Sequence, residues 1–251
     1  SRQLGFSTDI AARFFIDTVN TPNTQTVVIA QDQGSSERLF QMVRRFQNNL
    51  PPDKKLPTRY DTKNVLYWPT IDSYYFVGTA GSKKIGRGGT INNIHASEVF
   101  FWENPAEIIA GLMEAVPDSG NIILESTANG VGGVLYDEYW NAVAKRSPFN
   151  ARFYPWFYED RYRTDRLFHD EEFEISQEEL KYVEKVKKYW NGYTLDTQQL
   201  KWRRNKAATL KKTWEQEYPV TPEEAFISSG SRFITEDALK RIEEQLLEPT
   251  T

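Results

Sequence analysis

The chain opens with Ser1-Arg2-Gln3-Leu4-Gly5-Phe6-Ser7-Thr8, and this stretch decides how the rest is interpreted. In the pattern G-x-x-x-x-G-K-[ST], the second glycine lets the backbone approach a phosphate, and the residues after it open a helix whose free N–H groups face the anion. Gly5 fits that glycine, and Ser7 fits the hydroxyl that ligates Mg²⁺. The first glycine would fall before Ser1, so we expect the first part of the loop and the strand before it to be missing.

One position departs from the pattern, and a nearby cation could compensate for it. Phe6 stands where the pattern has lysine, which removes the usual phosphate-binding cation. Arg2 is a permanent cation at the start of the loop and could reach back to the phosphates. The alternative is an ordinary loop-to-helix junction, in which Ser7 or Thr8 caps an amphipathic helix.

The composition is that of an ordinary globular protein, with 251 residues, 39% hydrophobic and 26% charged. With no cysteine and two histidines, we do not expect a thiolate or histidine-built metal centre. No apolar run approaches the roughly 18 residues of a membrane span, and we expect no membrane partner. The net charge of −4 provides no global basic field, so any DNA contact depends on local patches.

Strands and helices alternate through the first part of the chain. Residues 26–30 form a β-branched run typical of a buried strand, and apolar residues recur at helical spacing from Ser36, a candidate cap, until Pro51. Further strands are predicted at residues 65–68 and 74–77, which form a pair, at 91–102 and 121–125, and at 151–157. We therefore predict an α/β fold with a mostly parallel sheet of at least five strands, flanked by helices.

Polar segments follow several of these strands. The loop at residues 78–89 has five glycines and three cations, so it either meets phosphate or is a solvated surface loop. Glu98 lies toward the carboxyl end of its predicted strand, where open α/β sheets bind ligands. Residues 126–130 form a cluster of small polar groups at the same edge, or simply a turn.

Beyond about residue 160 the chain changes to charged helices. Ser176 with Glu179, and Thr221 with Glu224, have the spacing of capping boxes, and Thr235 has the place of another cap. We therefore expect a core domain at residues 1–160 and a smaller, mainly helical subdomain at 161–251.

Charge runs in the helical part have two interpretations. Residues 199–212 carry six cations and no acid, which favours a solvated helix face, with a DNA-backbone contact as the alternative. The acidic residues at 170–174 are interpreted as a solvated face.

Three motifs together resemble one protein family. They are Ser-Arg-Gln-Leu-Gly-Phe-Ser-Thr at 1–8, His-Ala-Ser-Glu at 95–98 and Glu-Ser-Thr-Ala-Asn-Gly at 125–130. In order and spacing they resemble the ATPase domain of tailed-bacteriophage terminase large subunits, the motors that package DNA into procapsids. Residues 217–226 look like the segment that joins the ATPase to the nuclease in that family. The resemblance implies a P-loop NTPase of the ASCE (RecA-like) type, with a helical lid or linker subdomain.

The resemblance also implies a binding site for ATP and Mg²⁺. By this resemblance, residues 1–8 are the Walker A motif and residues 126–130 are the coupling motif. The residues that would bind the nucleotide are Arg2, Gln3, Leu4, Gly5, Phe6, Ser7, Thr8, Ser126, Thr127 and Asn129. The metal would lie at Ser7 and Ser97. Ser97 stands where Walker B has aspartate, which leaves the affinity for metal open.

Three residues would carry the catalysis. Glu98 would orient and polarise the attacking water, and Arg2 would replace the Walker A lysine, since this family moves that cation toward the start of the loop. Arg87 is the candidate for an arginine that acts on a neighbouring subunit's γ-phosphate, with Lys83 or Lys84 as substitutes.

By the same resemblance, the chain would couple ATP hydrolysis to translocation of double-stranded DNA, in the host cell cytoplasm during virion assembly. Its partners would be viral DNA, the portal ring of the procapsid, the small terminase subunit and further copies of itself in a ring, with the isolated chain a monomer. The chain stops before the family's nuclease domain, so no nuclease activity is expected. The alternatives are a helicase-like P-loop NTPase, or a non-catalytic module that docks on the portal.

Overall fold

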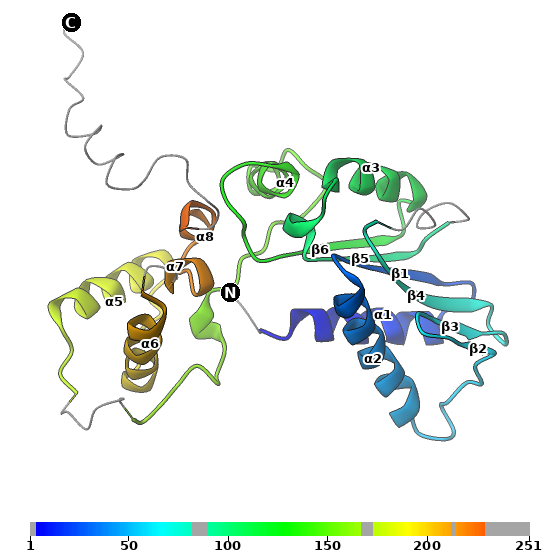
Figure 1. Cartoon of the computed structure of the whole chain (residues 1–251), viewed down its shortest axis with the longest axis horizontal. Coiled ribbons are helices and arrows are strands. Elements are labelled where there is room, and N and C mark those ends of the chain that lie inside the picture. Colours follow the sequence, from blue (N-terminus) through cyan, green and yellow to red (C-terminus); the bar gives the residue numbers. More distant parts are fainter. Residues whose placement is uncertain (1–3, 82–89, 167–172, 212–213, 229–251) are drawn as a thin grey trace, which may run out of the picture.

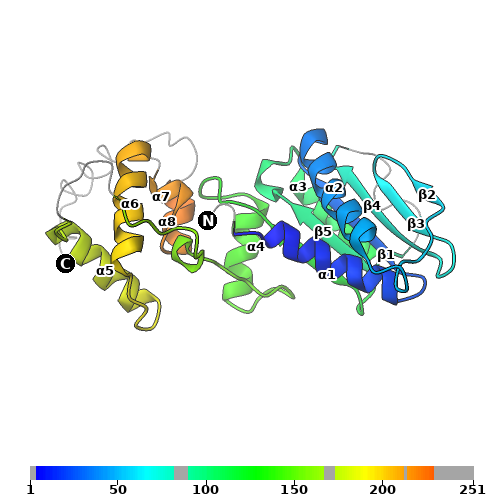
Figure 2. The same ribbon diagram turned by 90° about the horizontal axis from the view of Figure 1, so that it is seen from below.

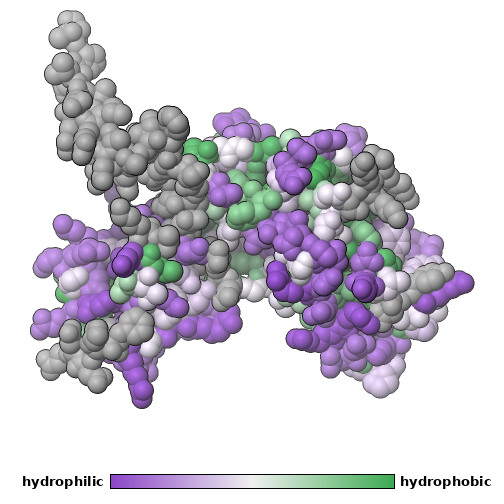
Figure 3. Space-filling view, in the orientation of Figure 1, coloured by the Kyte–Doolittle hydropathy of each residue, from purple (hydrophilic) through white to green (hydrophobic). Residues whose placement is uncertain are grey.

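A computed structural model describes residues 4–81, 90–166, 173–211 and 214–228. The chain forms two lobes, a sheet flanked by helices and a C-terminal group of helices (Figures 1 and 2). Hydrophilic residues cover most of the face shown in Figure 3. None of the helices in the described ranges has the length and apolar character that crossing a membrane requires.

The sheet has six strands in the order β2-β3-β4-β1-β5-β6. Their bounds are β1 Gln25–Ala30, β2 Tyr60–Asp61, β3 Val65–Trp68, β4 Ser73–Thr79, β5 Asn93–Ser97 and β6 Asn121–Glu125. Strands β4, β1, β5 and β6 are parallel, whereas β3 pairs antiparallel with both of its neighbours. The predicted α/β fold with a mostly parallel sheet is confirmed, as is the strand pair β3–β4.

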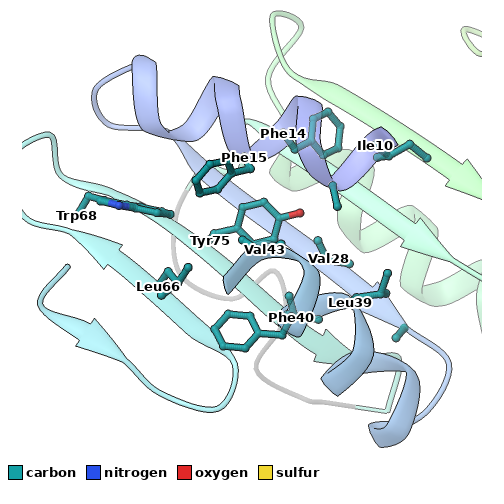
Figure 4. Close-up of a cluster of buried hydrophobic side chains, with 13 residues drawn as sticks. Ile10, Phe14, Phe15, Val28, Leu39, Phe40, Val43, Leu66, Trp68 and Tyr75 are labelled. Carbon is teal, nitrogen blue, oxygen red and sulfur yellow. The ribbon is translucent and has the colours of Figure 1, made fainter. Parts of the chain in front are cut away.

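Helices cover both faces of this sheet. Helices α1 (Phe6–Asn20) and α2 (Gln33–Asn49) pack on one face, in a core that includes Val28 of β1 and Tyr75 of β4 (Figure 4). Helices α3 (Pro105–Ala115) and α4 (Val134–Val143) pack on the other face, against Val27 and Ile29. A single 3-10 turn, η1 (Val99–Phe101), follows β5. The alternation of β1 side chains between the two cores is the expected consequence of a strand buried on both faces.

The second lobe is built around stacked aromatic rings. It contains η2 (Trp156–Tyr158), α5 (Gln177–Tyr189), α6 (Thr197–Leu210), α7 (Trp214–Glu217) and α8 (Pro222–Ser228). Trp156 stacks on Trp202 with ring centroids 5.1 Å apart, and Trp202 stacks on Tyr162 at 4.4 Å. Trp156 and Phe157 are fully buried in this cluster. The predicted strand at residues 151–157 is therefore wrong, because its aromatic side chains pack into the helical lobe through η2.

Helix caps agree only partly with the sequence predictions. The capping boxes of Ser176 with Glu179 and of Thr221 with Glu224 are present. Helix α2 is capped by Asp32, which accepts from the Ser35 amide, so the prediction of Ser36 as the cap is wrong. Residue 235 lies outside the described residues.

Cations of α6 bind acids and rings inside the helical lobe. The Arg203 guanidinium lies 3.9 Å from the centre of the Tyr182 ring, and Lys201 donates to the Asp165 carbonyl at 3.0 Å. Arg204 donates to both carboxylate oxygens of Glu179, at 2.9 and 2.5 Å. The expected solvated face is therefore wrong for Arg203 and Arg204, since both hold α6 against its neighbours.

We expect Arg204→Ala to destabilise the protein by about 2 kcal/mol at pH 7, because it leaves the buried Glu179 carboxylate without its partner. The expected loss of folding free energy lies between the losses measured for exposed ion pairs and for fully buried ones. The reason is that 34% of the Arg204 side chain is exposed. Chemical denaturation measures the loss. Lys187→Ala, which removes an exposed pair with Glu184, is the matched control and should change little.

The same difference should depend on pH. Burial alone raises the pKa of Glu179, but hydrogen bonds from Arg204 and Ser176 outweigh it and hold the pKa below its ordinary value of 4.5. A lowered folded-state pKa contributes stability above the unfolded value, and that stability is lost as the pH falls through the folded value. The gap between wild type and Arg204→Ala should therefore narrow below pH 4.5. A gap that stays constant from pH 7 to pH 3 would contradict this role.

Candidate nucleotide-binding site

The first turn of α1 has the geometry of an anion-binding helix start. Gly5 precedes the helix with φ 78° and ψ 10°, a left-handed conformation that favours glycine. Its carbonyl accepts from the amides of Thr8 and Asp9, at 3.1 and 3.0 Å. The amides of Phe6 and Ser7 precede these bonds and point out of the helix end, where an anion is favoured. Gly5 occupies the cap position, so the alternative with Ser7 or Thr8 as N-cap is wrong.

The side chains around Ser7 are engaged in packing. The Phe6 ring lies 4.2 Å from the ring of Tyr154, in the segment that enters the helical lobe. The Thr8 hydroxyl donates to the sulfur of Met42 on α2. Phe6 therefore serves the fold where the motif has lysine, and its backbone amide is what it can offer to a phosphate.

Glu98 lies directly after β5 and is tied to the loop after β6. Its backbone has φ 56° and ψ 45°, which is uncommon for a residue with a side chain. Its Oε2 accepts from the Ser126 hydroxyl at 3.2 Å and from the Thr127 amide at 3.3 Å. The structure thus brings Glu98, Ser126 and Thr127 together, while Asn129 lies exposed farther along the loop.

A second acid lies beside Ser97. Ser97 of β5 and Glu125 of β6 are paired in the register of the sheet. Oε1 of Glu125 is 2.8 Å from Nε2 of His95, whose side chain is fully buried. Burial alone raises the pKa of Glu125, but hydrogen bonds from His95, Ser7 and Ser97 outweigh it and lower the pKa. The lowered pKa favours the ionised carboxylate of Glu125, which lies beside Ser97 in the sheet.

These oxygen groups suit the magnesium ion that the resemblance implies. Mg²⁺ prefers oxygen ligands and is usually bound by one or two carboxylates together with substrate phosphates and water. The hydroxyls of Ser7 and Ser97 and the carboxylate of Glu125 provide such atoms. In the part of the chain that the structure describes, no three Asp, Glu or His side chains gather into a metal cluster.

Some predicted site residues are not covered by the structure. Arg2, Gln3 and Arg87 lie outside the described residues, as do Lys83 and Lys84. Leu4 precedes α1 and is partly buried.

Sequence reasoning missed the pair of His95 and Glu125. Both residues stand in the quoted motifs, yet neither was assigned a role. The available signal was an acid that ends an otherwise apolar strand. The missing information was the pairing of β5 with β6, which brings the two side chains together.

Comparison with known proteins identifies a similar fold. Neither a protein-family model nor a curated protein matches this chain. The structure is similar to the crystal structure of the HK97 bacteriophage large terminase, with a TM-score of 0.58 and 16% sequence identity. The match covers 96% of this chain and 48% of the terminase chain, so this chain spans about half the length of that protein. The chain thus has a terminase-like α/β fold.

Proposed function

We propose that this protein is the ATP-hydrolysing motor domain of a viral DNA-packaging terminase, active in the host cell cytoplasm during virion assembly. The observation that carries the proposal is the meeting of a phosphate-type helix start with Glu98 and the loop after β6. Ser7 opens α1, the helix that covers the sheet face on which Glu125 ends β6, and Glu98 is bound by the next two residues, Ser126 and Thr127. The similarity to the HK97 large terminase supports the same proposal.

In this proposal, the chain supplies charge and positioning for phosphoryl transfer. The amides of Phe6 and Ser7 and the guanidinium of Arg2 bind the phosphates. Glu98 orients the attacking water and accepts its proton, with its carboxylate held by Ser126 and Thr127. Ser7 and Ser97 would hold Mg²⁺, which would supply positive charge against the charge of the phosphates.

The same contacts suggest how hydrolysis moves the second lobe. After Thr127 the chain passes through Gly130, Gly132 and Gly133, all at positive φ, into α4. The α4 side chains Tyr136, Tyr139 and Trp140 surround Phe226 of α8, with ring centroids 4.9 to 6.2 Å away. A shift of the loop at Glu98 would therefore be passed through α4 to α8. We propose that this movement acts on double-stranded DNA in a ring of copies on the portal, with the small terminase subunit as a further partner.

The test is an ATPase assay with double-stranded DNA, portal and procapsid. We expect turnover that DNA and portal stimulate, and DNA that becomes protected inside procapsids. Arg2→Ala should lower kcat about 10²-fold, because it removes a charge that stabilises the transition state. Arg13→Ala, an exposed residue of α1 paired with Asp9, is the control. Absence of turnover under all conditions would leave the portal-docking module, and DNA unwinding without packaging would favour the helicase-like enzyme.

A further inference from the structure

We propose that Glu125 supplies the carboxylate that P-loop ATPases usually carry at the Walker B position, which Ser97 occupies here. The inference rests on the proposed function, and it assigns a role to an acid for which the sequence motifs give none. In P-loop NTPases, the magnesium ion is held by the loop's serine or threonine and by the Walker B aspartate. Ser97 offers a hydroxyl there but no charge. A site of this kind needs a carboxylate near Ser7 from another position.

The sheet register places Glu125 where such a carboxylate is needed. Val28 pairs with His95, and Ser97 pairs with Glu125, in the parallel ladders of β1, β5 and β6. Side chains at paired positions, and two residues apart on one strand, lie on the same face of a sheet. Val28 belongs to the core under α1 and α2. Glu125 therefore lies beside Ser97 on the face covered by α1, which carries Ser7.

Hydrogen bonds hold the Glu125 carboxylate toward this site. It lies beside Ser97 in the β5–β6 ladder, and the Ser7 and Ser97 hydroxyls are among the groups that lower its pKa. His95 holds one of its oxygens at 2.8 Å from inside the sheet. Among the described residues, the buried Nδ1 of His95 has no hydrogen-bond partner, so Glu125 is the contact that fixes this ring. His95 is accordingly a positioning residue for Glu125.

The two acids at this sheet edge have separate partners. Glu98 is bound by Ser126 and Thr127, beyond the end of β6. Glu125 is bound by His95 of β5 and lies beside Ser97 of the same strand. We therefore assign Glu98, held by the loop after β6, to water activation, and Glu125, held from β5, to the metal.

The test measures how much Mg²⁺ strengthens nucleotide binding, which is independent of turnover. Affinity for a fluorescent ATP analogue is titrated with Mg²⁺ and with EDTA, and Mn²⁺ binding is followed by electron paramagnetic resonance. In Glu125→Gln, the increase in nucleotide affinity on adding Mg²⁺ should be about ten- to hundredfold smaller than in wild type. This is the usual effect of removing a group that supports a metal ligand. Its affinity in EDTA should stay near wild type. Glu107→Gln, an exposed acid on α3, is the matched control.

A second pair of variants moves the carboxylate back to the Walker B position. Ser97→Asp in the Glu125→Gln background should restore most of the lost gain. Ser97→Asp alone should not enlarge the Mg²⁺-dependent increase in nucleotide affinity, because Glu125 already provides the charge. This single variant tests the inference even if Glu125→Gln fails to fold. An undiminished gain in folded Glu125→Gln, or a tenfold larger gain in Ser97→Asp alone, would overturn the inference and leave the proposed function standing. If Mg²⁺ does not change the ATP affinity of the wild-type protein, both the inference and the proposed function are overturned.

Discussion

Replacing Glu98 with glutamine is expected to leave ATP binding close to wild type while hydrolysis falls about 10³-fold. Glutamine keeps the size of the side chain, and its amide oxygen can still accept from Ser126 and Thr127. What it loses is the negative charge, which in the proposed mechanism polarises water and accepts its proton. The local backbone at φ 56° should persist, because the substitution leaves the two hydrogen bonds available.

Two measurements separate chemistry from binding in this variant. Single-turnover hydrolysis reports the chemical step, and equilibrium titration reports ATP affinity. Glu103→Gln replaces an exposed glutamate in the segment after η1 and should match wild type in both. A collapse of ATP affinity in Glu98→Gln would instead make Glu98 a structural residue or a metal-organising one.

Local patterns predicted most of the sheet lobe. The runs at residues 26–30 and 121–125 became β1 and β6 almost residue for residue. β1 is buried on both faces, which requires a continuous hydrophobic sequence, whereas β6 is a partly exposed edge strand. The run at 151–157 is similarly aromatic, yet its rings fill the core of the helical lobe. Composition alone does not distinguish these two environments, since both bury large side chains.

The candidate site was predictable where it follows a local motif. Gly5 and Ser7 were predicted from the spacing of a loop pattern, and Ser97 and Glu98 from the family resemblance; the structure brings Ser126 next to Glu98. Such spacing says little about which side chains meet across neighbouring strands.

Two features of the site required the tertiary fold. The contact of Glu125 with Ser97 needed the pairing of β5 with β6. Phe6 packs on Tyr154, a residue almost 150 positions later in the sequence. Predicting this contact requires knowing where that later segment lies in the fold. Both depend on long-range packing, which no local motif contains.

Replacing Arg87 with alanine is expected to lower ATP turnover about 10³-fold in a ring assembled on the portal, with little effect on the isolated chain. An arginine delivered to a neighbour's γ-phosphate can contribute about 10³ to 10⁵ in rate. Arg87 lies among Gly86, Gly88 and Gly89 in the sequence, where glycine permits the reach of a loop. Thr79, the last residue of β4, lies at the same sheet edge as Glu98, and Arg87 follows Thr79 in the sequence outside the described residues.

Mixing two inactive variants tests whether this arginine acts between subunits. Arg87→Ala subunits keep an intact Glu98, and Glu98→Ala subunits keep an intact Arg87. Mixed rings should therefore recover part of the activity wherever a complete site faces a complete arginine, while either variant alone stays slow. Lys83→Ala and Lys84→Ala are the matched controls, because they remove nearby cations of the same loop. Wild type and Arg87→Ala could instead show equal turnover that does not depend on protein concentration, under conditions where the ring demonstrably forms. That result would make Arg87 an ordinary surface residue. If turnover instead falls in Lys83→Ala or Lys84→Ala, mixing that variant with Glu98→Ala subunits identifies which lysine acts in trans.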